Sequence, residues 1–203
     1  IKMETEEIRE KKEPKRLPVW ACILLFALGL FVCMGLYGTI GFGLLSLILG
    51  DEARHPGLLV YTVTEASMLL SVLTPAVILL YFERRPFSDL GLTLKGHVRG
   101  LWYGLLVAML LYLIGFGLSL AIGEVEVTGF QFDPLNLLGT FVFCLLVALT
   151  EEIMMRGYIL GRLLHTRMNK FLALFVSALL FALLHIFNPN VAFLPMLNLV
   201  LAG

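Results

Sequence analysis

Residues that can carry a charge lie inside two successive apolar runs of the chain. The first run, LVALTEEIMMRGYILGR, contains Glu151, Glu152 and Arg156, and the second, FVSALLFALLHIFNPN, contains His185. An ionisable side chain costs about 2.5–3.5 kcal/mol to insert into a bilayer, so such residues tend to be functional. A carboxylate and an imidazole are also the side chains that most often transfer protons in catalysis.

Helix geometry separates the two glutamates. Glu152 and Arg156 are four residues apart and share one face of a helix, which predicts an ion pair. Glu151 is rotated from Glu152 by about 100°, so Arg156 cannot neutralise it as easily. We therefore expect Glu151 to be the free carboxylate, suited to act as a general base that takes a proton from water.

The distance along the chain predicts that Glu151 and His185 lie at the same depth. With a turn at about 165–169, Glu151 lies 14 residues before the turn and His185 lies 16 residues after it. At 1.5 Å per residue, their heights in an antiparallel hairpin differ by only about 3 Å. The sequence Asn188-Pro189-Asn190 should then break the second helix, and a broken backbone at that depth requires protein or water around it. We expect a water-filled pocket here.

Simpler interpretations of these residues remain open. The two glutamates and Arg156 could join helices without any catalysis, and a single histidine in a membrane helix can simply bond to a carbonyl. We interpret Glu65, near the outer end of its run, as structural. The chain contains no His-Glu-x-x-His and no Gly-x-Ser-x-Gly motif, and its three aspartates, Asp51, Asp89 and Asp133, lie outside the apolar runs. Known zinc, serine and aspartyl protease patterns are thus disfavoured.

The elements that carry these residues are predicted to be membrane helices. Of the 203 residues, 59% are hydrophobic and 15% are charged, whereas a soluble domain has about 25% charged residues. A membrane helix needs about 20 apolar residues, and frequent glycine without alternating polarity argues against a β-barrel. We expect an all-α, polytopic bundle with about five spans and the start of a further one, at 17–49, 58–82, 100–122, 134–150, 171–187 and 191–203.

Loop charge predicts the orientation of the spans. All but two of the 15 Lys and Arg residues lie in the charged tail 1–16, in 83–99 or in 162–170. If 17–49 crosses once, tilted or bent at Gly35–Gly43, all three segments lie on one side, which the positive-inside rule makes cytoplasmic. We expect a tail at 1–16 and one membrane domain at 17–203. Because the net charge is zero, no nucleic-acid partner is expected.

The two motifs resemble a known family. Glu151-Glu152-x-x-x-Arg156 followed by Phe181-x-x-x-His185 is similar to the first two motifs of the CAAX protease and bacteriocin-processing (CPBP or Abi) family, the type II CAAX prenyl endopeptidases. The segment ERRPFSDLGL resembles a loop that these proteins often carry, so the family-like core extends over about 58–203.

The resemblance implies an intramembrane peptidase that cuts a membrane-associated or prenylated peptide. Glu151 would activate water and His185 would help to hold it, while Glu152 and Arg156 would organise the site. Phe181 and Asn188 would lie at the substrate pocket. Members are commonly labelled metalloproteases, and a mechanism without metal is also proposed for them. A metal such as zinc, if used, would bind Glu151 and His185, but two ligands are fewer than the three that zinc usually takes.

The resemblance also leaves the activity and the extent of the chain open. The family's later motif, a His followed by Asn, is absent from 191–203, so we expect a C-terminal part to be missing. The alternatives to a peptidase are a non-catalytic binding or regulatory protein that uses the same pocket, and a small proton-coupled transporter. Expected partners are membrane lipid and a peptide or prenylated protein, in the plasma membrane of a bacterium or archaeon. The sequence predicts neither the substrate nor the oligomeric state.

Overall fold

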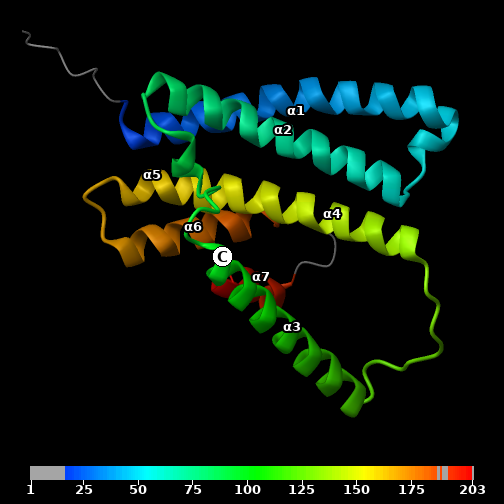
Figure 1. Ribbon diagram of the computed structural model, residues 1–203. Helices are drawn as coiled ribbons and strands as arrows, with labels where there is room; N and C mark the ends of the chain where they lie inside the picture. Colours follow the sequence, from blue (N-terminus) through cyan, green and yellow to red (C-terminus); the bar gives the residue numbers. More distant parts are fainter. Residues whose placement is uncertain (1–16, 187, 189–191, 203) are drawn as a thin grey trace, which may run out of the picture.

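Helices are the only regular elements in the residues that the computed structural model describes, which are 17–186, 188 and 192–202 (Figure 1). The predicted all-α fold is thus confirmed, while the predicted tail 1–16 lies outside the described residues. The elements in chain order are α1 (Val19–Leu49), η1 (Gly50–Arg54), α2 (Leu58–Phe82), η2 (Phe87–Leu90), α3 (Val98–Ala121), α4 (Pro134–Glu152), η3 (Ile153–Leu160), α5 (Gly161–Leu164), α6 (Lys170–Leu184) and α7 (Phe193–Ala202).

Four helical stretches are long and apolar enough to cross a membrane. They are Val19–Arg54, Leu58–Phe82, Val98–Ala121 and Pro134–Leu164. The fifth predicted span, 171–187, forms the shorter helix α6 of 15 residues, which is below the length of about 20 residues that a straight crossing needs. It ends early because the His185 amide bonds to the carbonyls of Ala182 and Leu183 and closes the last turn. The predicted start of a further helix at 191–203 corresponds to α7.

The first apolar run forms one continuous helix, as a single crossing requires. Helix α1 contains 31 residues and remains helical through the glycines at Gly35–Gly43. At 1.5 Å per residue its length is about 46 Å, which exceeds a hydrocarbon core of about 30 Å. A helix of this length must tilt or extend beyond the core when it is inserted.

Small residues bring α1 and α2 into close contact along their length. A Cβ atom added at Gly29 would lie 2.8 Å from the Cβ atom of Pro75, and Gly41 faces Ser67 in the same way. The helices α1 and α2 run side by side, and α4 lies below them (Figure 1). In contrast, α3 has no buried residue and points away from this group of helices (Figure 1).

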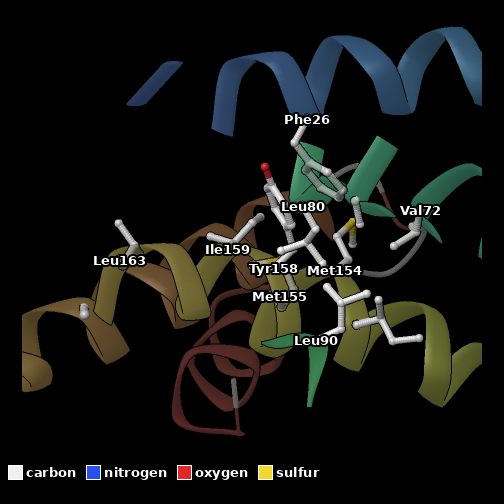
Figure 2. Close-up of a cluster of buried hydrophobic side chains, with 12 residues drawn as sticks. Phe26, Val72, Leu80, Leu90, Met154, Met155, Tyr158, Ile159 and Leu163 are labelled. Carbon is white, nitrogen blue, oxygen red and sulfur yellow. The ribbon is translucent and has the colours of Figure 1, made fainter. Parts of the chain in front are cut away.

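The buried core is centred on η3, the segment that follows the two glutamates. Ile153, Met154, Met155, Tyr158 and Ile159 are all buried there. Side chains from α1, α2 and η2 pack against them (Figure 2), namely Phe26, Val72, Ala76, Leu80 and Leu90. The ring of Phe26 stacks on that of Tyr158, with 4.3 Å between centroids. The segment that follows Glu151 and Glu152 is therefore buried on most of its surface.

Side chains cap the two helices of the predicted hairpin. Asp133 precedes α4, and its carboxylate accepts hydrogen bonds from the amides of Leu135 and Asn136, with Pro134 at the first helical position. Asn169 caps α6 in the same manner through the amide of Phe171. Caps of this kind satisfy amides that otherwise lack a partner at a helix start. The turn between α5 and α6 thus occupies His165–Asn169, as predicted.

Candidate functional site

Glu151 and His185 face each other across the hairpin. Glu151 lies near the end of α4, and His185 lies directly after α6. The Glu151 Oε1 atom is 3.5 Å from the His185 Nε2 atom, and the two side chains are 36% and 22% exposed. The prediction that the hairpin brings a carboxylate and an imidazole together is thus confirmed.

Contacts with Phe181 orient the imidazole of His185. Its Nδ1 atom is 2.9 Å from the Phe181 carbonyl oxygen, and because a carbonyl only accepts, this nitrogen carries the proton and donates. The two rings also touch, with centroids 4.6 Å apart and planes inclined by 55°. With Nδ1 used in this way, the Nε2 atom is the one presented to Glu151, as in histidines whose second nitrogen performs the chemistry.

Glu152 and Arg156 form the ion pair that their spacing predicted. A guanidinium nitrogen of Arg156 donates to Glu152 Oε1, and the two side chains are 40% and 53% exposed. Glu152 is therefore neutralised within its own helix, whereas Glu151 faces the imidazole. Adjacent carboxylates thus have different partners.

The first motif spans a change in helix type. Glu151 and Glu152 are the last residues of the α-helical part of α4, and Ile153–Leu160 continues as the π-helical segment η3. π-Helical turns are rare and occur frequently at functional sites. Arg156 is the one exposed residue of η3, with its neighbours buried on both sides.

Asn188 lies near the site, but its predicted role in a pocket is not tested. It is exposed, and its backbone N–H donates to the His185 carbonyl oxygen at 3.0 Å. Pro189 and Asn190, the rest of the predicted helix break, lie outside the described residues. The water-filled pocket around Glu151 and His185 therefore remains a prediction.

The side chains at the site do not make up a zinc site. A catalytic zinc ion usually takes three protein ligands, and Glu151 and His185 supply two. Throughout the part of the chain that the structure describes, no group of three His, Cys, Asp or Glu side chains could hold a metal ion. A metal at this position would need a further ligand from elsewhere.

The sequence pattern predicts a basic loop over 162–170, and for Arg162 this was wrong. Arg162 lies in α5, is 5% exposed, and pairs with Glu83 at the end of α2. The helix includes Arg162 and ends at Leu164, directly before the turn, and the ion pair gives the buried guanidinium a charge partner. Gly157, which lies against the Leu90 backbone, was also not singled out. The spacing of Gly157 and Gly161 within RGYILGR was the available signal.

Taken together, the long apolar helices and the facing Glu151 and His185 define a polytopic helical membrane protein with an acid–imidazole pair between two helices. Residues 133–203 match the family model described as Rce1-like, type II CAAX prenyl endopeptidase Rce1-like, so this part of the chain is similar to that family. The match includes both motifs, so the predicted resemblance is confirmed there. The match suggests an intramembrane peptidase.

Comparison with curated proteins and with solved structures finds no further similar protein. The family match does not include 58–132, so the family resemblance of the loop ERRPFSDLGL remains a prediction.

Proposed function

We propose that the chain is an intramembrane endopeptidase in which Glu151 activates a water molecule for attack on a peptide bond. The observation that carries the proposal is the approach of Glu151 Oε1 to His185 Nε2 at 3.5 Å. The family match over the same helices supports it. The ion pair of Glu152 with Arg156 explains why the neighbouring carboxylate is not the base.

The geometry leaves a position for the attacking water. Hydrogen bonds between oxygen and nitrogen or oxygen atoms are about 2.7–3.0 Å long, so one water oxygen can contact both atoms of a pair that is 3.5 Å apart. Glu151 would take one proton from this water while the water oxygen bonds to the carbonyl carbon. The carbon–nitrogen bond then breaks, and the proton passes from Glu151 to the leaving amine. His185 holds the water and does not change its own bonds.

The proposed substrate is a peptide that reaches the site from the membrane. The matching model is described as a type II CAAX prenyl endopeptidase, whose substrate class is a prenylated C-terminal peptide. Such a lipid-linked peptide partitions into the bilayer, because each buried methylene contributes about 0.8 kcal/mol.

Replacement of the base tests this function. In Glu151→Gln the amide cannot take a proton, so we expect kcat to fall by about 10²–10⁴-fold while the protein remains folded. The assay follows cleavage of an internally quenched, farnesylated peptide by the detergent-solubilised chain, and thermal unfolding reports whether the variant is folded.

Glu65→Gln is the matched control, since it removes a carboxylate from another membrane helix. Glu65 lines a separate cavity of about 320 Å³ between α1 and α2, so cleavage should stay within about twofold of the parent chain. If Glu151→Gln cleaves as fast as the parent, Glu151 is not the base, and a non-catalytic binding protein that uses the same residues becomes the better interpretation.

A further inference from the structure

The segment Glu83–Gly91 connects α2 to α3 and crosses over the helix that carries the first motif. Its end, η2, lies against η3, and Leu90 is 3% exposed within the core around η3 (Figure 2). An ion pair between Arg85 and Asp89, 3.3 Å apart, joins the two ends of the turn within this segment. The segment is therefore anchored to the bundle through Leu90, while most of its other residues are exposed.

The first fixed contact is between two backbones at Gly157. A Cβ atom added at Gly157 would lie 2.7 Å from the Leu90 carbonyl oxygen and 3.4 Å from its Cα atom. At Gly161, the next small residue along the helix, the added atom would lie 3.7 Å from the Asp89 carbonyl oxygen. The missing side chains let the backbone of the 83–91 segment rest directly on the helix.

The second fixed contact is a buried ion pair. Glu83 pairs with Arg162, and their side chains are 10% and 6% exposed. The Cys22 thiol donates to Glu83 Oε1 at 2.9 Å, and the Arg162 guanidinium lies 5.3 Å from the centre of the Tyr158 ring. Because a buried charge without its partner is strongly unfavourable, this pair ties α5 to the end of α2.

Both contacts lie further along the chain than Glu151. Glu151 precedes the π-helical stretch Ile153–Leu160, whereas Arg162 follows it and Gly157 lies within it. A π-helical stretch holds an extra residue compared with an α-helix. A return to the α-helical form would therefore rotate Glu151 by about 100° relative to Arg162, away from its position opposite His185.

We propose that the 83–91 segment is a positioning element for the site. Through the Leu90 backbone on Gly157 and through the ion pair of Glu83 with Arg162, it holds η3 in its π-helical form and thereby holds Glu151 opposite His185. The catalytic importance of this segment rests on the proposed function. Its effect on the distance between the Glu151 and His185 side chains does not. Gly157, Leu90, Glu83 and Arg162 are then positioning residues, which act on Glu151 through η3.

The test measures the geometry of the pair directly. Glu151→Cys and His185→Cys are combined in the full chain, treated with a short bifunctional thiol reagent, and the linked peptide is quantified by mass spectrometry. Adding Gly157→Ala, which forces the Leu90 backbone to shift, should lower the yield of the link several-fold. The matched control is Gly139→Ala in α4, where the added atom meets only the flexible tip of Leu58 at 2.8 Å, and its yield should not change.

A kinetic measurement on the chain with Glu151 and His185 intact provides a second readout. A displacement of catalytic groups by about 1 Å can cost about 100-fold in rate, so Gly157→Ala should lower kcat on the farnesylated peptide by about that factor. KM should stay within about twofold, since no contact with substrate is lost. If Gly157→Ala only destabilised the protein, the fraction of folded, active molecules would fall. The yield of the link between positions 151 and 185 in the folded molecules would then not change.

A second pair of variants keeps the inference falsifiable if Gly157→Ala does not fold. Glu83→Gln removes the buried charge partner of Arg162 and should also lower the yield of the link, whereas Glu124→Gln, in an exposed loop, should not. An unchanged yield in both Gly157→Ala and Glu83→Gln overturns the positioning role, whatever the peptide assay shows. If the parent chain cuts no peptide, but Gly157→Ala and Glu83→Gln still lower the yield of the link, only the proposed function is refuted. The positioning role then stands.

Discussion

Glu151 and Glu152 are neighbours in the chain with different surroundings. Glu152 pairs with Arg156 on an exposed face, whereas Glu151 faces His185 from the end of α4. The imidazole is held in turn by the Phe181 carbonyl. Two identical side chains can therefore have separate roles, one in the ion pair and one in the proposed proton transfer.

The contrast between the two glutamates gives the first prediction at this scale. Glu152→Gln should lower kcat on the farnesylated peptide by less than about tenfold, because it removes an ion pair and leaves the base in place. This loss is smaller than the factor of about 10²–10⁴ expected for a lost general base. The two variants are compared in the same cleavage assay, with equal folded fractions verified by thermal unfolding. Equal losses in both would contradict the division of roles.

At the scale of helices, close contacts at glycine determine which elements lie together. Gly29 and Gly41 let α1 approach α2, and Gly157 lets the 83–91 segment approach η3. Helices in lipid gain little from burying apolar surface against each other, so such close packing is a main source of their association.

A substitution in α1 tests the importance of this packing. Gly29→Ala places a methyl group 2.8 Å from Pro75, whose ring cannot move aside, so we expect a loss of about 1–3 kcal/mol in the free energy of unfolding. Gly35→Ala, in the same helix with nothing within 4 Å of the added atom, should cause no loss. Unfolding of both variants is measured in detergent micelles. Equal stability of the two would show that the α1–α2 contact contributes little.

At the scale of the whole molecule, three segments meet at one end of the bundle. The Cys22 thiol near the start of α1 bonds to Glu83 at the end of α2, and Glu83 pairs with Arg162 near the end of α5. The basic loop 83–99 and the turn before α6 therefore lie at the same end as the start of α1. This grouping is the one that a single crossing by 17–49 predicts, while its assignment to the cytoplasm remains a prediction of the positive-inside rule.

Labelling of introduced cysteines tests the orientation. Ser88→Cys and Arg167→Cys, both at exposed positions, should react with a membrane-impermeant maleimide only from the cytoplasmic side. Thr128→Cys, in the loop between α3 and α4, should react only from the other side. The unsubstituted chain gives the background from Cys22, Cys33 and Cys144. Reaction of Ser88→Cys and Arg167→Cys from opposite sides would contradict the arrangement.

The sequence by itself determined the helical class, most of the span boundaries and the meeting of Glu151 with His185. These depend on local hydrophobicity and on the fixed rise of a helix, which are properties of a single stretch of chain. The early end of α6 was not predicted, because it depends on how the last turn closes around His185.

Only the tertiary structure decided the contacts and burial of the residues around the first motif. Arg162 reads as a loop charge in the sequence, and its burial depends on Glu83, which lies 79 positions earlier at the end of another helix. The contact of Gly157 with Leu90 likewise joins this helix to a segment that is distant in the sequence. No local pattern encodes such contacts, because they arise from the way separate helices pack against each other.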